Sequence, residues 1–82
     1  MTRYYFHLVD GTDTLLDPEG VEISDGKIAA SALAQARAII AADAADGQID
    51  LRYRIEVRNE AEEVIHCLPF DQAVAIHRSA TP

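Results

Sequence analysis

The side chains of three histidines and one cysteine could carry chemistry near neutral pH. His7 lies between apolar residues and is two positions from Tyr5. A histidine beside a tyrosine hydroxyl on a rigid strand could transfer protons. Alternatively, its ring nitrogens could bond to nearby backbone or a carboxylate, and this structural role is the one we expect for His7.

His66 and Cys67 are adjacent, which raises the possibility of a metal site or a histidine-activated thiol. Neighbouring strand residues point to opposite faces, so the two side chains cannot act on one ion or substrate without a bulge. The sequence has no second cysteine and no histidine pair at the spacing of a helical metal site. We therefore expect no metal, no cofactor and no catalytic residue, and a small buried thiol at Cys67.

Charged residues form two further groups. Four carboxylates follow the first apolar run: Asp10, Asp13, Asp17 and Glu19. Their spacing does not match a calcium-binding EF-hand loop, so we expect them to form turns and to be solvated. Positive charge is concentrated at one place only: Arg52, Arg54 and Arg58. This stripe is either a solvated face on which Glu56 pairs with the arginines, or a docking patch for an acidic partner or a phosphate.

Composition limits the classes of partner. The chain has 82 residues, 7 Lys and Arg, 14 Asp and Glu, and a net charge of -7. Such a charge disfavours nucleic acids and anionic membranes. We see no apolar run near the roughly 20 residues of a membrane helix and no signal-peptide pattern, so we expect a cytoplasmic protein. The length fits one domain, residues 1–82. Because ten alanines lie between Ala29 and Ala45, large core residues are few, and a homodimer would relieve that shortage.

Hydrophobic periodicity predicts the elements. Residues 3–9 alternate as a strand with two apolar faces, one with Tyr4, Phe6 and Leu8 and the other with Tyr5, His7 and Val9. Short strands are expected at 14–16 and 21–23, and a long helix from Lys27 to about Asp46. Residues 53–58 form the clearest half-buried strand, and residues 63–68 return beside it. A short helix from Gln72 to His77 and a loose tail at 79–82 complete the chain.

These elements predict an α+β fold. An antiparallel sheet of three to four strands, in the order β-β-α-β-β, would carry the long helix on one face and a short C-terminal helix. A four-residue turn would set Val57 opposite Val64 and Ile55 opposite His66, while a three-residue turn would point Ile65 and Cys67 inward. We favour the first register. The expected core is Phe6, Leu8, Leu33, Ile40, Ile55 and Val57.

The run from Arg3 to Gly11, Arg-Tyr-Tyr-Phe-His-Leu-Val-Asp-Gly, resembles a family of small bacterial proteins classed as a domain of unknown function. The usual opening of that family is Arg-Tyr-Phe-Phe-His-Leu-Arg-Asp-Gly. The resemblance extends over residues 3–74 and includes Asp17, the run 19–22 and the run 68–70. It supports the architecture and implies no catalytic residues.

We expect a non-enzymatic interaction or accessory module that associates with itself, with Tyr5, His7 and Val9 facing the partner or the second copy. The alternative is a sensor or enzyme that binds a small ligand around Tyr5 and His7. The sequence alone does not identify the partner, the ligand or the biological process.

Overall fold

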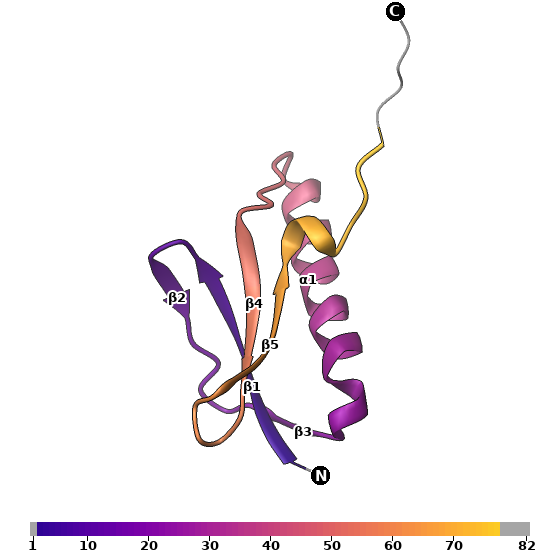
Figure 1. Ribbon diagram of the computed structural model, residues 1–82. Helices are drawn as coiled ribbons and strands as arrows, with labels where there is room; N and C mark the ends of the chain where they lie inside the picture. Colours follow the sequence, from indigo (N-terminus) through magenta and orange to yellow (C-terminus); the bar gives the residue numbers. More distant parts are fainter. Residues whose placement is uncertain (1, 78–82) are drawn as a thin grey trace, which may run out of the picture.

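The computed structural model describes residues 2–77 and has the expected α+β fold, an antiparallel sheet with one long helix on one face (Figure 1). The strands are β1 (Thr2–Asp10), β2 (Asp13–Leu15), β3 (Val21–Ile23), β4 (Tyr53–Arg58) and β5 (Val64–Pro69). Helix α1 spans Ile28–Ala45, and two single turns of 3-10 helix are η1 (Asp25–Lys27) and η2 (Phe70–Gln72). The tail expected at 79–82 lies outside the described residues.

The sheet has five strands rather than the three or four expected, because the two short runs after β1 pair with it separately. The order is β2-β1-β4-β5, and β3 also pairs with β1. Leu15 lies opposite Leu8 and Val21 lies opposite Tyr4, so the five residues 16–20 stand opposite only the three residues 5–7. The two surplus residues leave the ladder as a loop, which divides one long partner of β1 into two strands.

The hairpin of β4 and β5 has the expected facing but a different register. Val57 pairs with His66 and Ile55 pairs with Leu68, a shift of two residues from the expected pairing. The shift arises because the turn is tied between Asn59 and Glu63 and the register is irregular next to Arg58. A shift of two preserves the pleat, so His66 and Leu68 remain on the face of Ile55 and Val57, opposite to that of Cys67.

The core lies between the sheet and α1. Its most deeply buried large side chains are Ile55, Val57 and Phe70. Tyr4, Phe6, Ala32, Ala36, Ile40 and Ala73 join them, whereas Leu8 and Leu33 are only partly buried. The predicted core therefore contained Leu8 and Leu33 in place of Phe70 and the small alanines of α1.

The C-terminal helix is present, but it starts earlier and is shorter than the expected Gln72–His77. The chain forms only the turn η2, whose first residue, Phe70, is fully buried against Tyr53 with ring centroids 5.7 Å apart. The Arg37 Nε–H group donates a hydrogen bond of 2.8 Å to the carbonyl oxygen of Ala73. That carbonyl is therefore bonded to a side chain of α1 rather than to a following turn of helix.

Helix α1 covers only part of its sheet face. It packs against β4, β5 and η2, and Figure 1 shows it on the side of the molecule away from β2. Only Ala32, Ala36 and Ile40 of the helix are buried. The segment Asp25–Ala45 is also long and apolar enough to cross a membrane, contrary to the expectation from sequence, although core helices of water-soluble proteins meet the same criterion.

Candidate functional site

The loop that interrupts the partner of β1, residues 16–20 and here called the Asp17 loop, is bonded to β1 through one side chain. The backbone N–H of Phe6 donates to Asp17 Oδ2 at 3.2 Å, and the N–H of Gly20 donates to Asp17 Oδ1 at 3.1 Å. The Asp17 carboxylate thus takes the place of the backbone carbonyl of a neighbouring strand, to which the Phe6 N–H group would otherwise donate its hydrogen bond. This specific role was missed in the sequence, where Asp17 appeared only as a turn residue.

His7 holds the same loop from the other side. The backbone N–H of Asp17 donates to His7 Nδ1 at 3.0 Å. A ring nitrogen that accepts a hydrogen bond carries no proton, so the neutral imidazole has its proton on Nε2. The geometry therefore gives His7 the backbone contact that its structural interpretation requires. In this tautomer Nε2 is a hydrogen-bond donor and not a general base.

Arg3 and Gly20 complete the attachment of the loop. Arg3 Nη1 donates to the carbonyl oxygen of Glu19 at 2.6 Å, and Arg3 Nη2 pairs with Glu22 at 3.2 Å. Gly20 has a φ of +68°, and a β-carbon there would lie 2.8 Å from the carbonyl oxygen of Tyr4 and 2.9 Å from the ring of Tyr5. Only glycine satisfies both the positive φ and this close approach.

A pocket of about 330 Å³ opens on the sheet face that α1 does not cover. Tyr5 and His7 lie along β1 with ring centroids 6.4 Å apart and ring planes 16° apart. One wall is the Asp17 loop, and the other is the end of β4 with its turn. The residues of these walls include Leu16, Pro18, Arg58, Asn59, Glu60 and Glu62. The alternative function expected a pocket around Tyr5 and His7, and one is present.

The arginine stripe is extensively paired with carboxylates. Arg58 donates to Glu56 Oε1 through Nε at 2.8 Å and through Nη2 at 2.5 Å, and Arg54 Nη2 lies 3.7 Å from Glu56 Oε2. Arg52 precedes β4 and pairs with Asp50 at 2.8 Å, which lowers the pKa of Asp50 to about 2. These contacts match the interpretation of a paired, solvated face, with Glu56 shared by two arginines.

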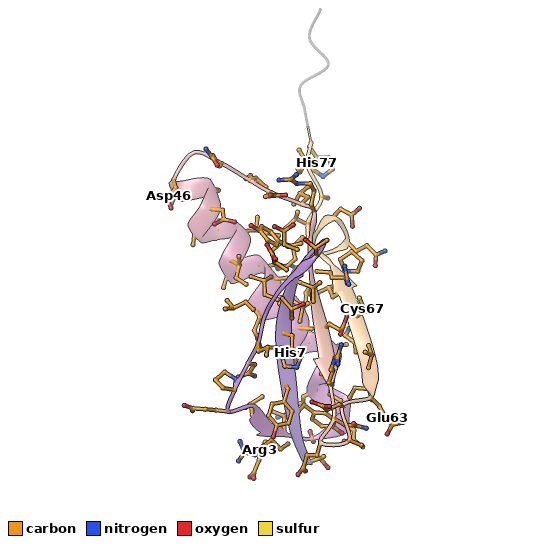
Figure 2. The ribbon with its side chains drawn as sticks, turned by 90° about the vertical axis from the view of Figure 1, so that its left-hand side faces the viewer. Arg3, His7, Asp46, Glu63, Cys67 and His77 are labelled. Carbon is orange, nitrogen blue, oxygen red and sulfur yellow. The ribbon has the colours of Figure 1, made fainter. Side chains whose placement is uncertain are left out.

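Other candidate residues are separated or differently placed. Val9 is only 4% exposed, so its side chain offers little surface to a partner. Cys67 is exposed, and the buried thiol expected there is wrong because β5 is an edge strand. Figure 2 shows His77 far from both His7 and Cys67, and the latter two lie two strands apart in one row of the sheet, on either side of Glu56. Among residues 2–77 no three His, Cys, Asp or Glu side chains are arranged to hold a metal ion.

Tyr4 joins the sheet to the start of the helix. Its hydroxyl donates a hydrogen bond to the carboxylate of Asp25, the first residue of η1. This hydrogen bond is the main reason that the pKa of Tyr4 is raised above its usual value, and burial adds to it. The bond fixes the chain where it leaves β3 and enters the helix.

The fold is a small α+β domain. Three residues of its opening motif, Arg3, Phe6 and His7, bind the Asp17 loop to β1. The chain belongs to the family of the domain of unknown function DUF6894, whose model matches residues 3–71. The expectation that the chain belongs to a family of unknown function is thus confirmed. No curated protein and no solved structure matches the chain significantly.

Proposed function

We propose that this protein is a small, acidic, non-enzymatic interaction module that associates with a second copy of itself. One observation carries the proposal: the β2 edge of the sheet face beside α1 has no cover. Leu15 and Leu16 are 70% and 66% exposed there, and Val21 is 40% exposed. Exposed apolar patches of this kind usually mark an interaction surface in a chain that stays dispersed in water.

The sheet explains why these side chains are bare. Leu8 and Leu15 pair directly across β1 and β2, so they point to the same face as Phe6 and Ile55. Helix α1 packs over β4 and β5 instead. A single helix about 10 Å wide covers roughly two strands at 4.8 Å spacing, so it leaves β2 bare, although Tyr4 and Phe6 of β1 are buried.

Sedimentation equilibrium of the full chain tests the proposal. We expect a mass of twice 9.0 kDa at micromolar concentration. A mass of 9.0 kDa throughout that range would contradict self-association. The expected partner contacts of Tyr5, His7 and Val9 on β1 are tested separately by Tyr5→Glu, which dissociates the assembly only if the opposite sheet face forms the interface. A cytoplasmic location is part of the same proposal, supported by a lone cysteine that needs no oxidising compartment.

A second function, binding of a small ligand, is favoured by the pocket at Tyr5 and His7. The donor His7 Nε2–H and the aromatic rings would hold a flat molecule with a hydrogen-bond acceptor. Native mass spectrometry of protein isolated from its own cells is the test. A bound mass that is lost in Tyr5→Leu, but kept in a Thr14→Ala control, would support this function. Spectra with no bound mass in the wild-type protein would count against it.

A further inference from the structure

Helix α1 is apolar over most of its circumference, and its only charged residues are Arg37 and Asp43. At about 100° per residue, the face opposite the buried Ala32, Ala36 and Ile40 is formed by the half-buried Ser31 and by four alanines. The alanines are Ala34, Ala38, Ala41 and Ala45, and all four are exposed. A helix with so few polar residues is typical of a protein interior, not of a surface.

An apolar groove of about 350 Å³ runs beside this helix. Phe6, Leu8 and Ile55 of the sheet line it, as do Gln35 and Ile39 of α1, and Leu15 stands at its β2 side. Its one ionisable residue is Asp17, whose carboxylate oxygens are already bonded to backbone N–H groups of Phe6 and Gly20. The groove therefore presents almost no charge in a chain of net charge -7.

We infer that the groove of each copy receives helix α1 of a second copy. The two sheets face each other about a two-fold axis, and α1 and its symmetry mate lie side by side between them. Each helix packs its buried face on its own sheet and its Ala34–Ala38–Ala41–Ala45 face on the partner's sheet. This arrangement rests on the self-association proposed above and specifies the surfaces that form it.

The polar residues of α1 fit this placement. Arg37 lies on the side of the helix opposite Gln35 and Ile39, and its guanidinium is bonded to the carbonyl oxygen of Ala73. In the dimer that side remains open to water, while the groove side meets the second helix. Alanine on the outer face lets the partner's sheet approach closely, with Leu15 and Leu16 together beside the helix.

The area is sufficient for a stable dimer. A helix of 18 residues is about 27 Å long and about 10 Å wide, so it covers about 270 Å² of a facing sheet. Each copy makes two such contacts, one by its helix and one by its groove, and the two helices touch along a third strip. Together these contacts approach about 800 Å² per partner, the size of a standard interface.

Matched lysine substitutions test the arrangement. Ala38→Lys puts a charge on the outer face of α1, whereas Ala44→Lys puts the same charge on the Arg37 side. Both positions are exposed in the single chain, and lysine is a good helix former. We expect Ala38→Lys to weaken dimerisation at least about 100-fold, with an unchanged circular dichroism spectrum, while Ala44→Lys remains dimeric.

A second pair of variants addresses the groove and guards against loss of folding. Leu15→Lys should dissociate the dimer, and Ile49→Lys should not, since Ile49 is 51% exposed and lies outside the groove. A wild-type dimer that survives both Ala38→Lys and Leu15→Lys would overturn this arrangement and leave self-association standing. A wild-type monomer would overturn both, and its sedimentation with phosphatidylcholine vesicles would assign the exposed helix to a lipid surface.

Discussion

At the scale of single residues, Gly20 is where the backbone leaves least freedom. Gly20→Ala forces a β-carbon into the Tyr4 carbonyl and the Tyr5 ring at a φ of +68°. We expect a loss of at least about 2 kcal/mol in the free energy of unfolding, measured by urea denaturation. Gly11→Ala has a similar φ of +55° but open space, so it isolates the cost of the positive φ. Gly26→Ala should be nearly neutral, and a loss at Gly20 no larger than the loss at Gly11 would refute the close approach.

Asp17 supplies a second test at this scale. An asparagine there keeps the shape but replaces one acceptor oxygen with an N–H₂ group, which then faces a backbone N–H of Phe6 or Gly20. We expect Asp17→Asn to lower the free energy of unfolding by about 1–3 kcal/mol. Asp13→Asn, at an exposed position in β2, removes the same charge as a control. Identical denaturation midpoints for the two variants would show that the carboxylate does not hold the loop.

At the scale of elements, the turn between β4 and β5 contains the one non-glycine residue with positive φ among residues 2–77. Glu62 has a φ of 63°, and its N–H donates to the carbonyl oxygen of Asn59 at 3.0 Å. Glycine adopts this conformation without the steric cost that glutamate bears, although it adds freedom to the unfolded chain. We expect Glu62→Gly to raise the free energy of unfolding by about 0.5–1 kcal/mol. Glu60→Gly, two residues earlier in the same turn, should lower it, and a loss at both positions would contradict the strain at Glu62.

The secondary-structure elements also show which features of the fold hydrophobic periodicity can predict. Alternation in residues 3–9 and 53–58 correctly assigned Phe6, Ile55 and Val57 to the core, because the side-chain period of a strand is local. It did not determine which residues pair, since a register shifted by two keeps every side chain on its face. Phe70 is buried through contacts with Tyr53 and the sheet. Hydrophobic periodicity could not predict this burial, because Phe70 is a single aromatic residue after Pro69 and belongs to no repeating pattern.

In the candidate site, too, features local in the sequence were predicted and contacts between distant residues were not. The pocket at Tyr5 and His7 was expected, because residues two apart on a strand share a face. The bonds from Asp17 to Phe6 and Gly20 join residues that are distant in sequence, and they appear only once the surplus residues of the Asp17 loop leave the ladder. Val9 was expected to face a partner, but its side chain is buried within the chain, outside the core between the sheet and α1.

At the scale of the whole molecule, we expect the stability of the fold to depend on dimerisation. A chain of 82 residues whose only long helix buries three residues has a small core, and an 18-residue helix packed on two sheets would enlarge it. If unfolding also separates two copies, mass action stabilises the folded state by about 2.7 kcal/mol for each 100-fold rise in concentration. We therefore expect the thermal midpoint, measured by calorimetry from about 1 to about 100 µM, to rise by several degrees. Ala38→Lys should show a lower midpoint that does not depend on concentration. A wild-type midpoint that is constant over the same range would mean that the exposed helix and the bare leucines are tolerated by a single folded chain.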